Sequence, residues 1–310
     1  MSKLLTVFGA TGNQGGSVIR AVLADPILSK QFTLRGITRD ASKPAAKDLL
    51  AKGVEIKTAD LSSAESVAAA IAGSHTVFLV TSPNFFNPSA SPELEHGKIV
   101  ADAAVAAKAQ HLIYSSLLNV TKETQGRLSH VVHFDQKADV EAYIRSKDIA
   151  STFVIPGYFM SNFTVSQMLR KGEDGTYTLA YPVSAEARFP LIDAEADTGK
   201  YVAAVLHDLN RHKGKQILAA SGYYTPTRII AEFEEVTGKK AVFYPIDEDT
   251  YKSYLPPSMA QELLENHLFI ESPGYYVGQS LEETQDLLAE IGLKSTSFKD
   301  FLEKNKTFFS

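Results

Sequence analysis

Seven residues near the start of the chain constrain its fold more than any other segment: Gly9-Ala10-Thr11-Gly12-Asn13-Gln14-Gly15. An apolar run, Leu4–Phe8, precedes them, and a helical pattern over Asn13–Leu23 follows. Three glycines between a strand and a helix are typical of a dinucleotide site, where they permit the tight turn, the approach of a pyrophosphate and close helix–strand packing. The helix N-terminus then attracts the anion. We expect ligand contacts from Gly9, Thr11, Gly12, Asn13, Gln14 and Gly15.

The first half of the chain alternates short β-branched runs with longer helical patterns, which is typical of a parallel sheet with crossover helices. Strands are predicted at Leu4–Phe8, Thr33–Thr38, Glu55–Thr58, Thr76–Val80, His111–Tyr114 and Thr152–Ile155. Helices are predicted at Asn13–Leu23, Ala45–Ala51, Ala64–Ala72, Glu93–Ala107 and Val131–Arg145.

After Pro156 the alternation becomes irregular. Further strands are predicted at Thr176–Ala180, Lys215–Ala219 and Ala241–Tyr244, and further helices at Asp197–Leu206, Thr227–Thr237, Met259–Asn266, Leu281–Ile291 and Phe298–Lys304. Lys215–Ala219 is expected to return to the main sheet, and Asp197 to cap its helix. The predicted fold is α/β, a Rossmann-type doubly wound parallel sheet with a smaller C-terminal α/β lobe. The nucleotide-binding domain would consist of residues 1–156 together with later core elements near 193–222. An interleaved lobe for a substrate or partner would consist of residues 157–310.

Charge and cysteine content exclude several classes of function. The formal net charge is −5 and no run of Lys or Arg occurs, so we expect no direct binding of nucleic acid. Cysteine is absent, so a response to redox state would have to act through a bound nucleotide. We expect no metal site. Neither a signal peptide nor a membrane-spanning segment is predicted, so we expect a cytoplasmic protein that does not bind membranes, with the nucleus as an alternative compartment.

The end of the second predicted strand bears on which nucleotide is bound. An acidic residue there accepts hydrogen bonds from the ribose of NAD, whereas an arginine suits the 2′-phosphate of NADP. This strand runs into Arg39, and Lys43 follows one helical turn later, so the sequence favours NADP(H). Asp40 leaves NAD(H) open, because it would face the ribose if the register shifted by one residue.

Two more strand ends are expected beside the nucleotide, since ligands of doubly wound sheets bind outside the carboxyl ends of the strands. Asp60 and Leu61 follow the third strand and are expected to flank the adenine; Asp60 as a helix N-cap is an equal alternative. Thr81 ends the fourth strand, where the nicotinamide half should pass.

Four segments together resemble the NmrA-like family, an atypical branch of the short-chain dehydrogenases. They are the glycine motif, Thr38-Arg39, His133–Lys137 and Pro156–Phe163. The similarity extends over nearly the whole chain, and it is closest to the NADPH redox sensors of that family. The resemblance implies an NADP(H)-binding Rossmann domain and a small C-terminal lobe.

Active short-chain dehydrogenases place a tyrosine and a lysine four residues apart on one helix, and the resemblance puts His133 and Lys137 there. Lys137 is expected to hold the nicotinamide ribose. His133 is either a proton donor or an ordinary helix residue. Ser115 ends the fifth strand, where the dehydrogenase serine orients a carbonyl; a local hydrogen bond is the alternative.

Aromatic residues are expected around the nicotinamide end. Phe85 follows the fourth strand, where the sensors tend to have an Asn-Tyr pair, and is a candidate for lining a substrate pocket. Tyr158 and Phe163 follow the sixth strand, Tyr158 as a cofactor contact and Phe163 as a pocket residue. The alternative for these residues is core between the two lobes.

Two functions from different classes follow. The first is an NADP(H)-responsive regulatory protein with a protein partner, motivated by a complete cofactor motif beside a missing catalytic tyrosine. The second is an NADPH-dependent reductase of a small unsaturated or carbonyl substrate, in which Lys137 positions the nicotinamide and His133 or Tyr158 supplies the proton.

Overall fold

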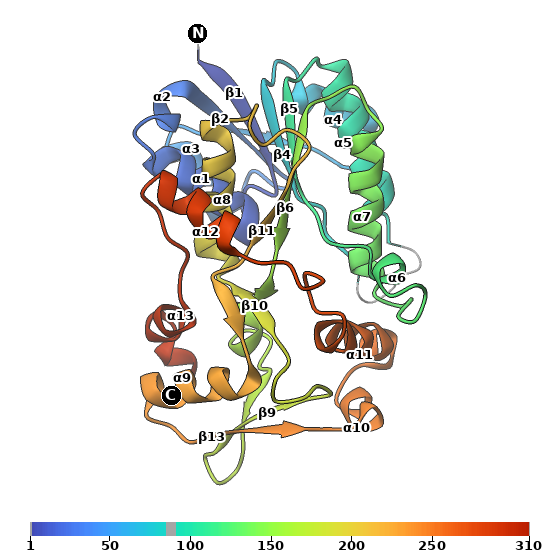
Figure 1. The fold of residues 1–310 in the computed structure, drawn as a ribbon. Helices are drawn as coiled ribbons and strands as arrows, with labels where there is room; N and C mark the ends of the chain where they lie inside the picture. Colours follow the sequence, from blue (N-terminus) through green and yellow to red (C-terminus); the bar gives the residue numbers. More distant parts are fainter. Residues whose placement is uncertain (1, 85–90, 310) are drawn as a thin grey trace.

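The computed structural model describes residues 2–84 and 91–309 (Figure 1). Within them, a parallel sheet of seven strands has the order β11-β6-β5-β4-β1-β2-β3. Its strands are β1 (Lys3–Phe8), β2 (Phe32–Thr38), β3 (Glu55–Thr58), β4 (Thr76–Leu79), β5 (His111–Ser115), β6 (Ser151–Pro156) and β11 (Gln216–Ala219). The chain runs outward from β1 to β3 and then crosses to β4 on the other side. The topological switch point, where such sheets bind ligands, therefore lies between β1 and β4.

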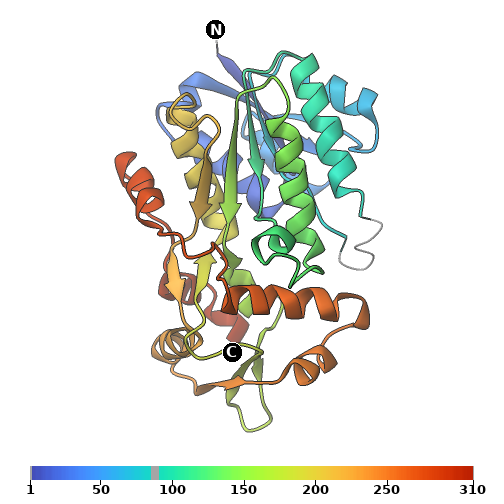
Figure 2. The same ribbon diagram turned by 45° about the vertical axis from the view of Figure 1, so that its right-hand side comes forward.

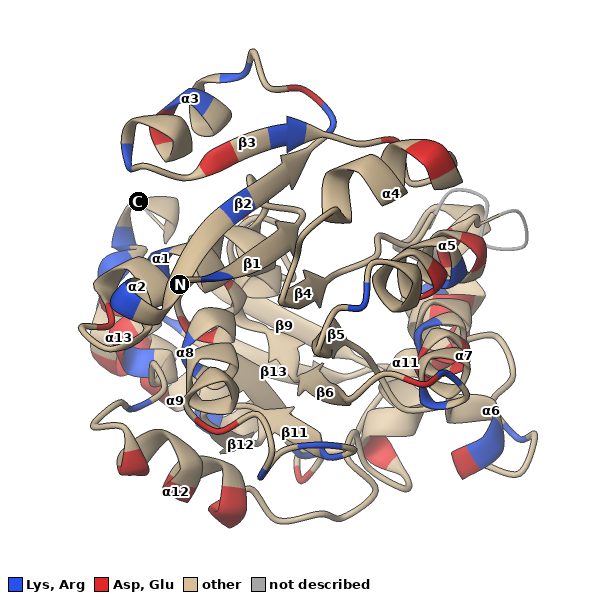
Figure 3. Ribbon diagram, turned by 90° about the horizontal axis from the view of Figure 1, so that it is seen from above, with Lys and Arg blue, Asp and Glu red and all other residues tan. Residues whose placement is uncertain are grey.

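Helices cover both faces of this sheet, as the view in Figure 3 shows. One face carries α1 (Asn13–Ala24), α2 (Leu28–Gln31), α8 (Ala194–His207) and α12 (Glu282–Glu290). The same face carries α3 (Pro44–Ala51), beside β3. The other face carries α4 (Ala64–Ile71), α5 (Glu93–Ala106) and α7 (Val132–Arg145), with α6 (Val120–Glu123) below α7. The predicted doubly wound fold is confirmed.

Helices α1 and α8 are in very close contact. A Cβ added to Gly199 of α8 would lie 2.1 Å from the carbonyl oxygen of Ser17 in α1, and the N–H of Gly199 donates to Ser17 Oγ at 2.9 Å. The C-terminal half of the chain thus supplies a helix to the nucleotide-binding half, and β11 extends the same sheet next to β6.

A smaller lobe lies below the sheet (Figure 2). It holds two three-stranded sheets, β12-β10-β7 and β13-β9-β8, within the described residues. Their strands are β7 (Tyr158–Phe159), β8 (Leu169–Lys171), β9 (Tyr177–Tyr181), β10 (Phe189–Ile192), β12 (Gly222–Tyr224) and β13 (Ala241–Pro245). Its helices are α9 (Pro226–Thr237), α10 (Glu248–Ser253), α11 (Pro257–Glu271) and α13 (Phe298–Lys304). None of the helices described is long and apolar enough to cross a membrane.

The predicted cap at Asp197 is wrong. Helix α8 begins at Ala194, and Asp193 caps it by accepting from the N–H of Ala196 at 3.1 Å. Asp197 is fully buried inside the helix, where its carboxylate accepts from the backbone N–H and hydroxyl of Thr296 and pairs with Lys200. It ties α8 to the segment that leads into α13.

Candidate nucleotide site

The loop between β1 and α1 closes tightly against the end of β4. Gly9 has φ +66°, and a Cβ on it would lie 2.8 Å from Val80 Cγ1. A Cβ on Gly15 would lie 2.3 Å from the carbonyl oxygen of Gly9, so the first turn of α1 packs directly on the loop. Both glycines are required by the protein's own packing, as the motif predicts.

Gly12 differs from these two glycines. It is exposed, has φ −93° and ψ 177°, and a Cβ on it would meet only the oxygen of Gly9 at 3.4 Å, an ordinary contact. Neither the backbone conformation nor internal packing requires glycine here. Within the described residues no side chain caps α1, and its first turn has no acidic residue. The open surface at Gly12, next to free helix N–H groups, therefore fits an anion that approaches the backbone from outside.

Gln14 and Ser115 join this loop to β5. The hydroxyl of Ser115, which is fully buried, donates to Gln14 Oε1 at 2.7 Å. Both predicted contact residues are thus next to the carboxyl end of β4, on either side of the switch point. This bond joins residues 101 positions apart, so it is not the local hydrogen bond of the alternative, and a role for Ser115 in a substrate pocket stays a prediction.

The cations at the end of β2 are available to a ligand. Arg39 and Lys43 are exposed and have no ion-pair partner in the described part of the chain. Asp40 is engaged: its Oδ1 accepts from the hydroxyl and backbone N–H of Ser42 at 2.6 and 2.9 Å, and these bonds lower the pKa of Asp40. This edge therefore presents two exposed cations beside an aspartate whose Oδ1 is already hydrogen-bonded.

Asp60 and Leu61 follow β3, as expected. Oδ1 of Asp60 accepts from the hydroxyl and N–H of Ser62, and these hydrogen bonds lower its pKa. The alternative role as a helix cap is wrong, because Ser63 caps α4 through the N–H of Ser66. Leu61 is partly buried against the core.

Thr81, at the end of β4, and Lys137 of α7 belong to one buried network. The ammonium of Lys137 donates to the carbonyl oxygen of Thr81 at 2.8 Å, to Thr81 Oγ1 at 3.1 Å and to Oε1 of Glu93 at 2.5 Å. Glu93 begins α5 and is fully buried. Each of the three ammonium protons thus has an acceptor. A ribose hydroxyl would reach this ammonium only by replacing one of them.

The hydrogen bonds of this network have a defined direction. Thr81 Oγ1 donates to Glu93 Oε1 at 2.6 Å, so the hydroxyl of Tyr114, 2.9 Å from Thr81 Oγ1, donates to it. Burial, and then the charge of Glu93, raise the pKa of Tyr114 well above its ordinary value, which keeps this phenol a neutral donor. Burial lowers the pKa of Lys137, and Glu93 opposes that shift.

His133 contacts the C-terminal lobe. Its Nδ1 lies 2.6 Å from Oε1 of Glu262 in α11, and its backbone N–H donates to the same oxygen at 2.8 Å. Two residues before α7 begins, the backbone N–H of His130 donates to Oε2 of Glu265 at 2.7 Å, and its Nδ1 lies 2.6 Å from Oε1. Figure 2 shows α11 crossing below the lower end of α7. His133 therefore has a role in joining the two parts of the molecule.

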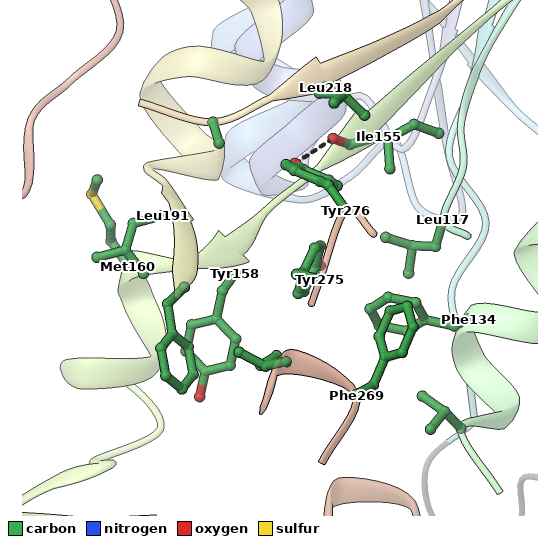
Figure 4. Packing of buried hydrophobic residues seen from close by; sticks show 14 of the residues in the cluster. Leu117, Phe134, Ile155, Tyr158, Met160, Leu191, Leu218, Phe269, Tyr275 and Tyr276 are labelled. Carbon is green, nitrogen blue, oxygen red and sulfur yellow. Dashed lines mark hydrogen bonds between the residues drawn. The ribbon is translucent and has the colours of Figure 1, made fainter. Parts of the chain in front are cut away.

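Tyr158 and Phe163 lie in the core of the lobe. The hydroxyl of Tyr158 is 2.9 Å from that of Tyr181, and burial raises the pKa of Tyr158 to about 12. The ring of Phe163 packs between those of Tyr158 and Phe298, at 6.0 and 5.2 Å between centroids. Figure 4 shows part of this core, including Tyr158. These positions match the core alternative, and Phe85 lies outside the described residues.

The comparisons with known proteins place this chain in a family. The sequence profile of the NmrA-like family matches residues 1–302. The chain belongs to the NmrA-like family. It is 31% identical to the NmrA-like family domain-containing oxidoreductase ptmS of Penicillium ochrochloron, over 98% of this chain and 94% of that protein.

Solved structures share the fold of this NmrA-like protein. NmrA, a negative transcriptional regulator, has been solved with NADP and with NAD; in each case the TM-score is 0.81 at 23% identity, over 98% of this chain and 95% of the other. The NADPH-dependent quinone oxidoreductase QOR2 of Escherichia coli, complexed with NADPH, gives a TM-score of 0.76 at 21% identity, over 97% of this chain and 99% of the other.

Sequence reasoning missed three buried carboxylates of this NmrA-like protein: Glu93, Glu262 and Glu265. Glu93 is the first residue of a predicted helix, where an acidic side chain is ordinary, so nothing local distinguished it. Glu262 and Glu265 are three residues apart and hence on one face of α11, but only the fold shows that this face meets α7.

A cavity of ≈ 510 Å³ lies beside α7 and has the volume of a small-molecule site. Its lining includes Leu117, Leu118, Glu141, Arg145 and Val277. Neither Lys137 nor the glycine loop lines it. It is therefore separate from the candidate nucleotide site.

Proposed function

We propose that this NmrA-like protein binds NADP(H) at the switch point between β1 and β4. The observation that carries the proposal is Gly12, an exposed glycine that internal packing does not require, at the uncapped N-terminus of α1. Arg39 at the end of β2, which has no ion-pair partner among residues 2–84 and 91–309, supports the phosphorylated nucleotide. Asp60 and Leu61 would flank the adenine, and Thr81 and Lys137 would face the nicotinamide half. When bound, the nucleotide would supply a hydride donor or acceptor.

We propose further that the protein is regulatory and responds to the state of the bound nucleotide. The three side chains considered for proton or ribose chemistry are engaged: Lys137 with Glu93, His133 with Glu262 and Tyr158 with Tyr181. Helix α7 carries Lys137 on the nucleotide side and His133, one turn away, on the lobe side. If nucleotide binding displaces α7, the contact between His133 and Glu262 would displace α11 as well. The surface of the C-terminal lobe that is offered to a protein partner would then change.

Regulation of this kind requires unequal affinities of the two nucleotide states for the two conformations. Hydrogen exchange of residues 257–271 tests it. We expect NADPH and NADP+ at saturation to give different exchange rates in α11, whereas α9, which lies on the opposite side of the molecule from α7 in Figure 1, exchanges alike in both. Equal exchange in α11 would contradict the regulatory proposal and leave nucleotide binding in place.

The second candidate is an NADPH-dependent reductase of a small unsaturated or carbonyl substrate. The similarity to ptmS, a protein named as an oxidoreductase, over nearly the whole chain favours it. Lys137 would then hold the nicotinamide ribose after releasing one of its present acceptors. Steady oxidation of NADPH with a carbonyl, quinone or enone panel would support this candidate if Lys137→Ala abolishes it and Lys108→Ala, an exposed change, does not.

A further inference from the structure

The ion pair between Glu93 and Lys137 is buried at the end of β4. The side chain of Glu93 is 0% exposed and that of Lys137 8%. Their helices, α5 and α7, meet without a spacer, because a Cβ on Gly97, one turn after Glu93, would lie 2.5 Å from both methyl carbons of Val140. The pair is therefore shielded from water and salt.

A buried amine without a counter-ion loses its proton far more readily than an exposed one. Glu93 is the anion in direct contact with the Lys137 ammonium. The other titratable groups near it are Tyr114 from β5, held neutral, and His133 and Glu141 on α7 itself, which pair with Glu262 and Arg145. Thr81, from β4, does not titrate. Glu93 is thus the group on which the charge of Lys137 depends.

Oε1 of Glu93 takes both bonds, from Lys137 and from Thr81, while no hydrogen bond reaches its Oε2 within residues 2–84 and 91–309. A pair that served packing alone would be replaceable by apolar residues of similar volume without loss of stability. Burying the second carboxylate oxygen of Glu93 without a hydrogen bond also costs folding free energy. Packing alone therefore does not account for the ion pair, whereas its effect on the position and charge of Lys137 does.

We propose that Glu93 is the positioning residue for Lys137: it fixes the ammonium beside the end of β4 and keeps it protonated, so that the contribution of Lys137 to nucleotide binding does not vary with pH across the neutral range. The inference rests on the proposed NADP(H) site and assigns a residue that the dehydrogenase pattern does not contain.

The test compares dissociation constants for NADPH from about pH 6 to about pH 9 in four proteins. They are the wild type, Glu93→Gln, Glu93→Asp and Glu141→Gln. Glu141→Gln is the matched control, because Glu141 is also a buried carboxylate, lies on α7 and pairs with Arg145 instead of Lys137.

We expect the wild type and Glu141→Gln to give the same pH profile. Glu93→Gln should bind progressively more weakly than the wild type as pH rises, by up to about tenfold for each pH unit above the pKa of Lys137 in that variant, until the lower affinity of the neutral-amine form is reached. Glu93→Asp, whose carboxylate is retained but one methylene further away, should lie in between. A constant loss of affinity at every pH, or no loss, would overturn the proposal. If Glu93→Gln does not fold, Glu93→Asp carries the test, and a wild-type profile in it would be the contradicting result.

A second readout needs no nucleotide. In protein labelled with ¹⁵N-lysine, the Lys137 side-chain signal, assigned through Lys137→Arg, should titrate at a lower pH in Glu93→Gln than in the wild type. Equal titration would overturn the inference even if NADPH binds. A wild type that binds no NADPH would instead overturn the proposed function, and the shifted titration would still stand.

Discussion

Glu262 of α11 holds the N-terminus of α7 through a single residue, His133, whose backbone N–H and imidazole both meet Oε1 of the glutamate at 2.8 and 2.6 Å. Glu265 contacts His130, two residues before α7 begins, with Oε2 at the backbone N–H and Oε1 at Nδ1. The first N–H groups of a helix lack partners within it, and the helix dipole favours negative charge there. The lobe thus provides the cap that no side chain near the start of α7 supplies within the described residues.

Removing this cap should destabilise the protein. Glu262→Ala removes a buried carboxylate that the N–H and imidazole of the partly buried His133 both contact, which should cost about 1–3 kcal/mol of unfolding free energy. Urea denaturation measures it. The control is Glu290→Ala, which breaks an exposed pair with Arg211 and should cost less than about 1 kcal/mol. Equal losses in the two variants would contradict the cap.

Glu265, the carboxylate beside Glu262 on α11, makes stability depend on acid pH. Burial opposes ionisation of Glu265, but hydrogen bonds from Gln261 and His130 outweigh it and lower the pKa below the ordinary 4.5. A depressed folded-state pKa contributes stability that is fully present above the unfolded value and is lost as pH falls through the folded value. Wild type should therefore lose more stability than Glu265→Gln between about pH 6 and pH 3. Parallel denaturation midpoints for the two proteins across that range would be the opposite result.

The contact between Gly97 and Val140 should tolerate no added methyl group. Gly97→Ala gains helix propensity of up to about 1 kcal/mol. The clash with the two Val140 methyl groups, at 2.5 Å, should outweigh this gain and give a net loss of about 1–2 kcal/mol. Thermal unfolding of a double-mutant cycle checks the cause. Gly97→Ala/Val140→Ala should lose less than the sum of the single changes, and strict additivity would exclude this contact as the reason.

Two glycines of one loop should respond differently to the same substitution. Gly15→Ala places a methyl 2.3 Å from the carbonyl oxygen of Gly9 and should cost about 1–3 kcal/mol of stability. Gly12→Ala makes only an ordinary contact and should cost less than about 1 kcal/mol, yet weaken NADPH binding by roughly tenfold or more. Denaturation and calorimetry on both variants separate the effects. Normal NADPH affinity in Gly12→Ala would contradict a pyrophosphate at that surface.

The elements of the nucleotide half could be predicted because their signals are local. The strand, glycine turn and helix over Lys3–Ala24 lie within one short stretch, and β3, predicted at Glu55–Thr58, has those bounds in the structure. β7 and β12 were not predicted: they are two and three residues long and exist because they pair with β10. Strands that short have no periodicity to read.

In the site, too, local features could be predicted and contacts between distant segments could not. The loop glycines could be named from their spacing, whereas the surroundings of Lys137 could not. Glu93 lies 44 positions away along the chain, and Glu262 lies 129 from His133, so both contacts come from packing between distant segments. The resemblance to dehydrogenases identified Lys137 as a site residue but could not indicate that its ammonium is already hydrogen-bonded on all sides.

We propose that NADP(H) is the ligand and that Arg39 selects it over NAD(H). Calorimetric titration of nucleotide-free protein with NADPH and NADH tests it most directly, with Arg39→Ala and, as the matched control, Asp40→Asn. We expect the wild type and Asp40→Asn to prefer NADPH, and Arg39→Ala to lose roughly 10- to 100-fold of that preference, since a charge-assisted bond to phosphate contributes about 1.5–3 kcal/mol. A wild type that prefers NADH and loses that preference in Asp40→Asn, or that binds neither nucleotide, would contradict the account.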